Sequence, residues 1–435
     1  MRAAVIGAGF AGCEAAWQLN KAGIETNLYE MKPKKFSAAH KSENFCELVC
    51  SNSLKAERLN SAAGLLKAEM QKLGSLCVEA AYKTKVPAGG ALAVDRDEFS
   101  KLVTEKIKSC EYVHIINEEV LRLPPADVVI IAAGPLASEG LSETIQDLCG
   151  NELSFFDAAA PIVSADSIDM KLAFTQSRYD RGGEDDYINC PMDKAQYEEF
   201  YEAVMSAESA DLHSFDKKKD VYEGCMPIEV LASRGKDTMR YGPLKPVGLV
   251  NPETGHRPWA NLQLRKENTG GTMYNLVRFQ TNLKFGEQKR VFSMFPALHN
   301  AEFLRYGVMH RNTFINSPKL LSSAFNLRND KKIFFAGQIT GVEGYMESAA
   351  SGIMAGINAA RMLNNKDMLV LPNTTMIGAL SRYISNGTVE NFQPMGANFG
   401  VLPPLSEKIR DKSERYMAYA DRGMNDLNKE LEESK

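Results

Sequence analysis

The sequence predicts an α/β fold in which a discontinuous parallel-sheet domain is interrupted by an inserted α+β domain. A strand–turn–helix–strand unit opens the chain, short strands separated by Gly and Pro occupy its middle, and a second strand–glycine–helix unit follows. A chain of 435 residues is also too long for one ordinary hydrophobic core. We therefore expect a first domain part, an insert, a second domain part and a charged C-terminal helix or tail, over residues 1–165, 166–299, 300–400 and 401–435.

The opening unit carries a glycine pattern that is typical of dinucleotide binding. An apolar run leads into Gly7-Ala8-Gly9 and Gly12, and a second strand ends on Glu30. Gly7 permits the tight turn, Gly9 lets a pyrophosphate approach the backbone, and Gly12 lets the helix pack closely on the strand. The pyrophosphate would lie at the helix N-terminus, where unpaired N–H groups and the helix dipole favour an anion. These features predict a Rossmann-like domain.

Glu30 restricts which nucleotide this domain holds. It lies 18 residues past Gly12, where a carboxylate can accept a hydrogen bond from a ribose 2′-hydroxyl. Because a carboxylate disfavours a 2′-phosphate, we expect FAD or NAD rather than NADP as the tightly held nucleotide. A lone G-x-G-x-x-G matches many glycine-rich turns, so the prediction rests on the complete order of strand, turn, helix, strand and acid.

Three later strands extend the predicted domain. Residues 112–116 and 127–133 have strand character, and the second strand leads to Gly134 in a turn that suits either the edge of a nucleotide site or an ordinary βα loop. An apolar strand at 332–338 precedes a helix that keeps one face small. The N-terminus of that helix can point at the far end of a bound cofactor, and close helix packing is a compatible interpretation.

The inserted segment is uneven in charge. We expect a helix over 193–206 and a strand over 272–279. Residues 184–223 contain 12 acidic and 4 basic residues, whereas residues 234–290 contain 11 basic and 4 acidic residues. Two interpretations stay open, because the pattern fits either an uneven solvated surface or an anionic partner docked on residues 234–290.

The composition excludes several classes of protein. No apolar run approaches the ~18 residues of a membrane helix, and the N-terminus begins a core strand without the features of a secretory signal, so we expect a cytoplasmic protein. The eight cysteines form no C-x-x-C pair and show no metal-ligand spacing with the six histidines, which predicts reduced thiols and no metal site. The net charge of −4 argues mildly against nucleic acid as a partner.

Two cysteines are candidates for chemistry. Cys50 precedes Ser51 and Ser53, which could cap a helix, and a thiol near a helix N-terminus becomes more nucleophilic because its pKa falls. The alternative for Cys50 is a buried structural thiol. Cys225 follows a glycine and precedes Pro227 by two residues, which predicts that it lies in a loop. Two interpretations stay open, because a thiol in a loop can be a reactive nucleophile or an inert side chain.

Seven sequence strings occur in an order that is similar to that of one enzyme family. They resemble the bacterial folate- and FAD-dependent tRNA (uracil-5-)-methyltransferases, and the resemblance runs from residue 1 to about residue 400. The strings are VIGAGFAGCEAAWQL, ELVCSNSLKA, VPAGGALAVDRDEFS, YEGCMPIEVLASRG, GPLKPVGL, RYGVMHRNTFINSP and FFAGQITGVEGYMESAASGIMAGINAAR.

The resemblance implies a chemistry and its cofactors. 5,10-Methylenetetrahydrofolate would give its one-carbon unit to reduced FAD for transfer to uracil C5 in the tRNA T-loop, and NAD(P)H would supply the reducing equivalents. Cys225 would add to uracil C6, and Cys50 would be its partner near the flavin. The residues implied to hold FAD are Gly7, Ala8, Gly9, Gly12, Glu30, Gly134, Gly337, Gln338, Gly341, Val342, Gly344 and Tyr345.

The same resemblance implies tRNA as the partner, with its phosphates on the basic segment 234–290, and no required protein partner. The oligomeric state stays open. One alternative keeps the chemistry but moves it to a ribosomal RNA uridine. Another is the related flavoprotein that modifies the tRNA wobble uridine with a GTPase, although that family carries an additional C-terminal helical domain. A small-molecule flavin oxidase or monooxygenase, or a flavin sensor, would leave Cys225 and the basic segment without a role.

Overall fold

In this computed structural model, the N-terminal unit lies at the centre of a five-stranded parallel sheet. The structure describes residues 1–37, 39–150, 152–181, 183, 186–210, 226–266, 271, 273–388, 392 and 394–434. The strand order is β16-β7-β1-β2-β6, with bounds Ile333–Phe335, Val128–Ile131, Arg2–Ile6, Glu25–Tyr29 and Val113–Ile116. All four residues of β7 are buried, as expected for a strand with both faces covered. The three later strands predicted from the sequence are therefore present, each with shorter bounds.

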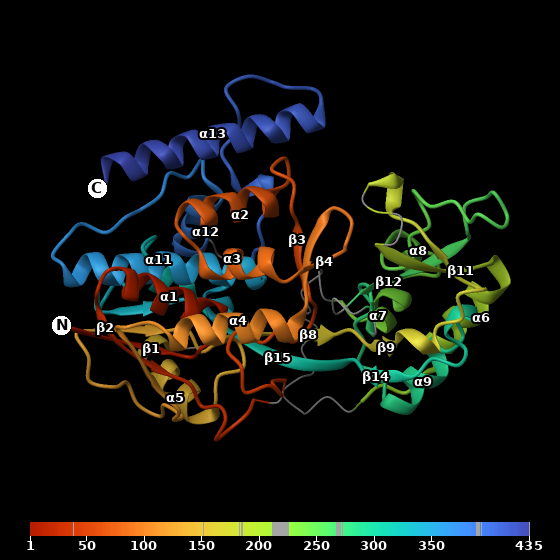
Figure 1. Cartoon of the computed structure of the whole chain (residues 1–435), viewed down its shortest axis with the longest axis horizontal. Helices are drawn as coiled ribbons and strands as arrows, with labels where there is room; N and C mark the ends of the chain where they lie inside the picture. Colours follow the sequence, from red (N-terminus) through yellow and green to blue (C-terminus); the bar gives the residue numbers. More distant parts are fainter. Residues whose placement is uncertain are drawn as a thin grey trace.

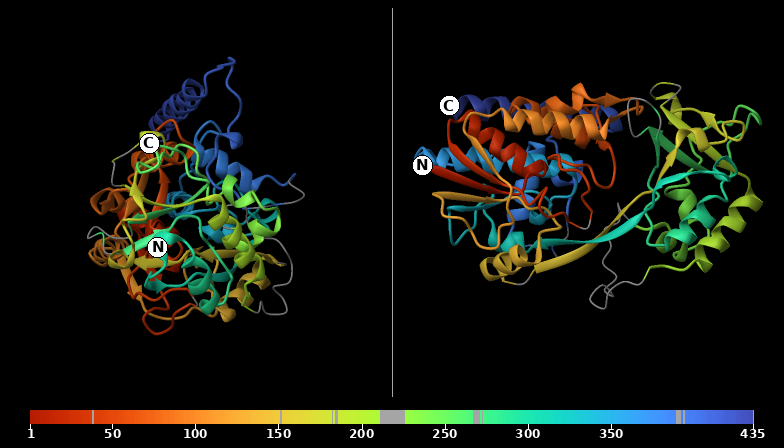
Figure 2. Two further views of the ribbon diagram at one scale, coloured as in Figure 1. Left: turned by 90° about the vertical axis from the view of Figure 1, so that its right-hand side faces the viewer. Right: turned by 60° about the horizontal axis from the view of Figure 1, so that its bottom comes forward.

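Helices cover both faces of this sheet. Helices α1 (Phe10–Lys21) and α11 (Tyr345–Leu363) lie side by side on one face, and α5 (Glu139–Cys149) lies on the other (Figure 1, Figure 2). A Cβ on Gly352 of α11 would overlap the backbone of Ala11, and a Cβ on Gly356 would lie 2.7 Å from the carbonyl oxygen of Ala15. The small face of α11 therefore allows direct contact between the two helices that follow the two strand–glycine turns.

A second group of helices and a small sheet complete the first body. The helices are α2 (Ala62–Lys72), α3 (Leu76–Lys83), α4 (Arg96–Lys108), α10 (Ser317–Leu320), α12 (Met376–Ser385) and α13 (Lys412–Glu433). The sheet has the order β3-β5-β4, with bounds Ser53–Ala56, Ala91–Val94 and Lys85–Val86. Helix α13 is the predicted charged C-terminal helix and packs against α2 (Figure 1).

The inserted body contains a six-stranded sheet with the order β10-β11-β12-β13-β9-β14, whose bounds are Phe174–Thr175, Tyr187–Met192, Ala260–Lys266, Met273–Leu276, Ile162–Ser164 and Phe303–Arg305. Its helices are α6 (Lys194–Ser206), α7 (Ile228–Ser233), α8 (Thr238–Tyr241) and α9 (Phe285–Phe292). The neighbouring strands among these six pair antiparallel. Strands β9 and β14 lie just outside residues 166–299, and those limits of the insert stay a prediction.

The inserted body has its own hydrophobic core. The rings of Phe200 and Phe295 lie 4.9 Å apart, and those of Phe279 and Phe292 lie 5.1 Å apart. Helix α6 begins where the sequence predicts it, because Asp193 and Gln196 form a capping box at its N-terminus. The strand predicted over 272–279 corresponds to the shorter β13.

Paired strands and side-chain hydrogen bonds join the bodies. Strands β8 (Glu152–Ala159) and β15 (Val308–Ile315) pair antiparallel and run from one body to the other (Figure 2). In addition, Arg265 of β12 donates from Nε to Asn52 Oδ1 at 3.0 Å and from Nη2 to Ser51 Oγ at 2.8 Å. The Asn52 side-chain amide donates to the carbonyl oxygen of Lys266 at 2.7 Å. The loop that carries Cys50 is thus attached to the inserted body.

Candidate active site

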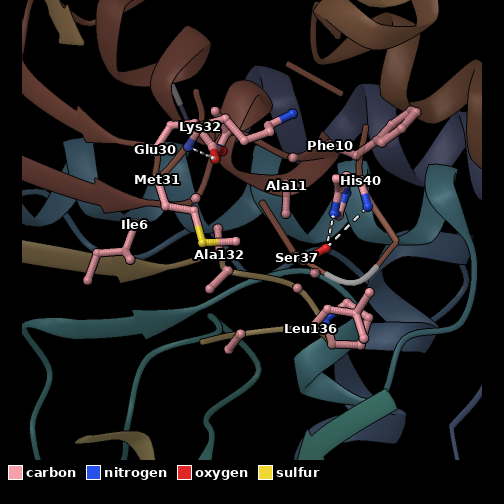
Figure 3. Close-up of a pocket in the computed structure, with 18 of the residues that line it drawn as sticks. Ile6, Phe10, Ala11, Glu30, Met31, Lys32, Ser37, His40, Ala132 and Leu136 are labelled. Carbon is pink, nitrogen blue, oxygen red and sulfur yellow. Dashed lines mark hydrogen bonds between the residues drawn. The ribbon is translucent and has the colours of Figure 1, made fainter. Parts of the chain in front are cut away.

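A deep cleft opens at the carboxyl ends of β1, β2, β7 and β16, the edge where parallel α/β sheets bind ligands. It encloses about 1360 Å³ of empty space, its open mouth included. Figure 3 shows side chains from separate chain segments that surround it. Nine of the predicted site residues line this cleft, namely Gly7, Ala8, Gly9, Glu30, Cys50, Gly134, Gly337, Gln338 and Tyr345.

The first glycine turn has the geometry that a pyrophosphate needs. Gly7 has a φ of +100°, and a Cβ there would lie 2.7 Å from the carbonyl oxygen of Ala132. Gly12 does not line the cleft. It packs directly against the turn, because a Cβ on it would overlap the carbonyl oxygen of Gly7. A Cβ on Gly9 would meet no protein atom within 4 Å, and no side chain caps the N-terminus of α1. Open space and free N–H donors therefore coincide at the position where an anion would bind.

Glu30 lies at the end of β2 with its carboxylate directed at this turn. One carboxylate oxygen accepts the N–H of Ala8 at 2.9 Å, and the other accepts the N–H of Lys32 at 3.0 Å (Figure 3). An ionised carboxylate has about four acceptor sites, so it can accept a ribose hydroxyl in addition to these two N–H groups. The residues present at this turn therefore fit the adenosine side of a dinucleotide.

The second strand–glycine–helix unit forms the other side of the cleft. Gly337 follows β16 with a φ of +89°, and Gly344 caps α11 with a φ of +126° and no side-chain cap. Gly341, Val342 and Gly344 do not line the cleft. Instead, Gly341 lies against the ring of Phe392, where a Cβ would overlap that ring. These three residues shape the backbone behind the site, and their direct contact with a cofactor stays a prediction.

Cys50 and Tyr345 are in direct polar contact in the cleft. The Cys50 N–H donates to the Tyr345 hydroxyl oxygen at 2.9 Å, and the Cys50 Sγ lies 3.2 Å from the same oxygen. The Tyr345 ring stacks on Phe10 with ring centroids 4.8 Å apart. Burial, with a contribution from the nearby Cys50, raises the pKa of Tyr345 well above its usual value. The phenol therefore stays protonated at neutral pH and can donate a hydrogen bond to the sulfur.

The expected helix after Cys50 is wrong. Ser51 and Ser53 cap no helix, because Ser53 begins the strand β3 and pairs with Ala93 of β5. The Ser51 hydroxyl instead accepts hydrogen bonds from the N–H of Ser53 at 3.1 Å and from Arg265. The helix N-terminus near Cys50 belongs to α11, which begins at Tyr345 and is distant in sequence.

Cys225 lies outside the described residues, so its approach to Cys50 stays a prediction. The chain on both sides of residues 211–225 is held by one short stretch of the inserted body. The N–H of Ala210 donates to the carbonyl oxygen of Asn282 at 2.8 Å, and the N–H of Ile228 donates to that of Gln280 at 2.8 Å.

Four other described cysteines fit a structural role. Cys13, Cys46, Cys77 and Cys190 are buried free thiols, and desolvation raises the pKa of each, to about 12 for Cys77. Among the described residues, no group of His, Cys, Asp and Glu could hold a metal ion. In the same part of the chain, no helix is long and apolar enough to cross a membrane.

Several cleft residues were not predicted from the sequence. Ser37 and His40 line the cleft, and the Ser37 hydroxyl lies 2.6 Å from His40 Nδ1 (Figure 3). Arg96 of α4 donates to the carbonyl oxygens of Leu48 and Val49 and so supports the chain just before Cys50. Ser37, His40, Leu48 and Val49 belong to a segment without regular secondary structure, and no helical or strand periodicity marks it.

Comparison with known proteins places this site in a family. The model of the family described as glucose inhibited division protein A matches residues 2–367. Methylenetetrahydrofolate--tRNA-(uracil-5-)-methyltransferase TrmFO from Acetivibrio thermocellus is 58% identical over 421 residues, which cover 97% of this chain and 96% of the relative. This chain belongs to the TrmFO family. The family resemblance expected from the seven sequence strings is thereby confirmed.

Other similar proteins agree with membership of the TrmFO family. TrmFO from Lactobacillus gasseri is 54% identical over 432 residues, covering 99% of this chain and 98% of that protein. The structure of Aquifex aeolicus GidA has a TM-score of 0.70 and 16% sequence identity, and the match covers 99% of this chain and 75% of that one. At this low identity the GidA structure supports the fold alone.

Proposed function

We infer that this protein is an FAD-dependent enzyme that methylates uracil C5 in tRNA with 5,10-methylenetetrahydrofolate as the one-carbon donor. The observation that carries this conclusion is the identity of 58% to a TrmFO methyltransferase over nearly the whole length of both chains. The Rossmann-like cleft beside Cys50 supports it, because this reaction needs a dinucleotide site and a thiol close together. As the finer proposal, the target is the T-loop uridine, and NAD(P)H is the reductant.

Different residues of the cleft bind different parts of FAD. The free N–H groups at the start of α1 bind the pyrophosphate, and Glu30 accepts the ribose hydroxyl. Gly134, Gly337 and Gln338 border the cleft around the rest of the cofactor. Bound FAD supplies the redox chemistry that turns the methylene unit of the folate into a methyl group. These roles are consistent with the shape of the cleft and stay proposals.

The cysteines would activate the uracil. Carbon C5 of uracil is a poor nucleophile until a thiolate adds at C6 and shifts the electrons of the C5–C6 double bond toward the O4 enolate. We assign that addition to Cys225. After C5 has formed its bond to the one-carbon unit, a base removes the C5 proton and the bond between that unit and its carrier breaks. A hydride that derives from NAD(P)H then completes the methyl group, and the bond between sulfur and C6 breaks as the C5–C6 double bond forms again. Cys50 is the proposed base, and the Tyr345 hydroxyl orients its sulfur.

The proposal is tested by incubating the flavin-loaded protein with NAD(P)H, methylenetetrahydrofolate and either undermodified tRNA or ribosomal RNA, followed by nucleoside mass spectrometry. We expect 5-methyluridine in the T-loop of tRNA, and none with Cys225→Ala. Methylation of ribosomal RNA alone would identify the alternative substrate, and flavin reduction without a methylated nucleoside would contradict the proposed activity. Because tRNA is the substrate, we propose that the enzyme acts in the cytoplasm, without a required protein partner.

A further inference from the structure

The basic segment 234–290 is not a uniformly positive face. Lys236, Lys284 and Arg290 form ion pairs with neighbouring glutamates at 3.1, 2.7 and 2.5 Å. Arg265 is buried and holds the loop of the first body. Much of the positive charge of this segment is therefore neutralised by glutamates or buried, and it is not available to a large anionic partner.

A groove in the inserted body collects such cations. It encloses about 1300 Å³ of empty space with its mouth, and its walls come from residues 171–174, from 191–196 at the start of α6, and from the 251–259 loop. Lys171, Lys194 and Arg257 line it from these three separate places and are exposed. None of the three forms an ion pair with another residue that the structure describes.

Trp259 and Arg240 form one wall of this groove. The Arg240 guanidinium lies 3.8 Å from the centroid of the Trp259 ring, and its Nε donates to the Trp259 carbonyl oxygen at 2.9 Å. Lys194 Nζ lies 5.5 Å from the same ring centroid. Trp259 nevertheless keeps 37% of its surface exposed. The aromatic ring therefore holds cationic groups in place while part of it stays open to a ligand.

The acidic residues of the groove do not cancel its charge. Asp193 and Glu253 line it as well, but Lys171, Lys194, Arg240 and Arg257 outnumber them, so the lining keeps a net charge of +2. The Asp193 carboxylate accepts the N–H of Gln196 in the capping box of α6, and Asp237 pairs with Arg240 at 2.7 Å. Three cations without a described ion-pair partner remain around a cavity with an aromatic wall, which is the chemistry that binds a nucleic acid backbone.

We propose that this groove binds the sugar–phosphate backbone of tRNA at a site separate from the cofactor cleft. This inference rests on the proposed function, since tRNA is the polyanion that the enzyme must hold. Figure 1 shows α6 and β11 on the side of the inserted body that lies away from α1 and α11. A ligand that contacts both the groove and the cleft must therefore be extended, as a folded RNA is.

The two tryptophans of the chain allow occupancy of the groove to be observed directly. Trp17 lies in α1, in the other body, and Trp259 is in the groove. In Trp17→Phe, all indole emission comes from Trp259, and we expect saturable quenching when undermodified tRNA is added. In Trp259→Phe, which keeps Trp17, tRNA should cause little change. Absence of quenching in Trp17→Phe, or quenching by poly-glutamate but not by tRNA, would overturn the proposal.

A charge-reversal variant tests the cations. Lys171→Glu/Lys194→Glu/Arg257→Glu should bind tRNA at least about tenfold more weakly at 0.1 M salt, and the slope of log affinity against log salt should fall by about 2 to 3, since each lost phosphate contact removes about 0.9. The matched control is Lys72→Glu/Lys108→Glu/Lys366→Glu, which changes the net charge equally at exposed positions of the first body. Flavin content and thermal stability should stay at wild-type values in both variants.

The outcomes separate this inference from the proposed function. Equal loss of tRNA affinity in both triple variants would contradict binding at the groove, because it would show only a general effect of net charge. If the wild-type protein methylates tRNA and the groove variant binds tRNA with unchanged affinity, binding at the groove is contradicted. The proposed function would then stand. Wild-type protein that neither binds nor methylates tRNA would contradict the proposed function itself.

Discussion

The hydroxyl of Tyr345 connects Cys50 with the cofactor cleft at the scale of single residues. It accepts the Cys50 N–H and lies 3.2 Å from the sulfur, while its ring stacks on Phe10 at the start of α1. Because burial raises the pKa of the phenol, it keeps its proton through the neutral range. Tyr345 is therefore a positioning residue for the sulfur, and its effect can be separated from cofactor binding.

Replacing Tyr345 by Phe keeps the stacked ring and removes the two hydrogen bonds. The hydrogen bond to the sulfur contributes about 1 kcal/mol, so we expect single-turnover methylation to slow by about fivefold. Flavin content should remain at the wild-type level. Tyr82→Phe is the control, since Tyr82 is exposed. An unchanged methylation rate in Tyr345→Phe would show that the Tyr345 hydroxyl does not position the Cys50 sulfur for the reaction.

Gly9→Ala separates the cofactor site from the stability of the fold. A Cβ at this position meets no protein atom within 4 Å, so we expect the unfolding free energy of the apoprotein to change by less than about 1 kcal/mol. The same Cβ would occupy the path of the pyrophosphate, and FAD affinity, measured by titration of apoprotein, should fall at least about tenfold. Gly286→Ala on α9 is the control, and equal FAD affinity in both variants would place the pyrophosphate elsewhere.

At the scale of elements, buried carboxyl groups hold helix N-termini together in the first body. Glu69 of α2 accepts the N–H groups of Met376 and Ile377 at the start of α12, at 2.7 and 2.9 Å. Glu14 of α1 similarly accepts the N–H groups of Leu76 and Cys77 at the start of α3. These contacts link elements that surround the parallel sheet.

Glu69 should make the stability of the protein depend on pH. Burial raises its pKa to about 8 in the folded state, above the value of 4.5 expected in the unfolded chain. Between these values the folded state binds more protons than the unfolded state, so the contribution of Glu69 to stability is lost as pH rises from about 5 to 8. We expect Glu69→Gln to gain about 4 kcal/mol relative to wild type across that range, about 1.4 kcal/mol for each pH unit.

The measurement is denaturant unfolding of both proteins at several pH values, with Glu105→Gln on the exposed surface of α4 as the control. The difference between wild type and Glu69→Gln should change steadily with pH, whereas the difference for Glu105→Gln should stay nearly constant. Parallel curves for wild type and Glu69→Gln would show that Glu69 is ionised in the folded state at all these pH values.

At the scale of the whole molecule, Arg265 holds the two bodies in a fixed relation near Cys50. Arg265→Met removes the hydrogen bonds to Asn52 and Ser51 and leaves the Asn52 oxygen without that donor. We expect faster amide hydrogen exchange around residues 50–53 and slower methylation, with flavin content retained. Lys266→Met is the matched control, because Lys266 contacts Asn52 only through its carbonyl oxygen. Equal exchange in both variants would contradict this role.

The sequence predicts the parts of this molecule that local patterns encode. The turn from Gly7 to Gly12 and the acid Glu30 belong to one continuous unit, so their arrangement follows from their spacing. The helix expected after Cys50 is wrong, because pairing of Ser53 with Ala93 determines a strand there. Likewise, the contact between Cys50 and Tyr345 joins residues that are 295 positions apart, and no local pattern encodes it.

The charge pattern of the insert shows a similar limit. Counting charges indicates that residues 234–290 are basic, but it does not distinguish the buried Arg265 from the exposed Arg257. Lys171 and Lys194 lie outside that segment and still line the groove. Only the folding of separate strands and loops around one cavity brings these cations together.

The most direct test of the central claim follows the methyl group itself. Methylenetetrahydrofolate carrying deuterium on its methylene carbon would be supplied to the flavin-loaded protein with unlabelled NAD(P)H and undermodified tRNA. If folate donates the carbon and reduction completes the methyl group, 5-methyluridine in the tRNA will carry both deuterium atoms and one hydrogen on that methyl group. A methyl group without deuterium, or no methylated uridine at all, would contradict the account.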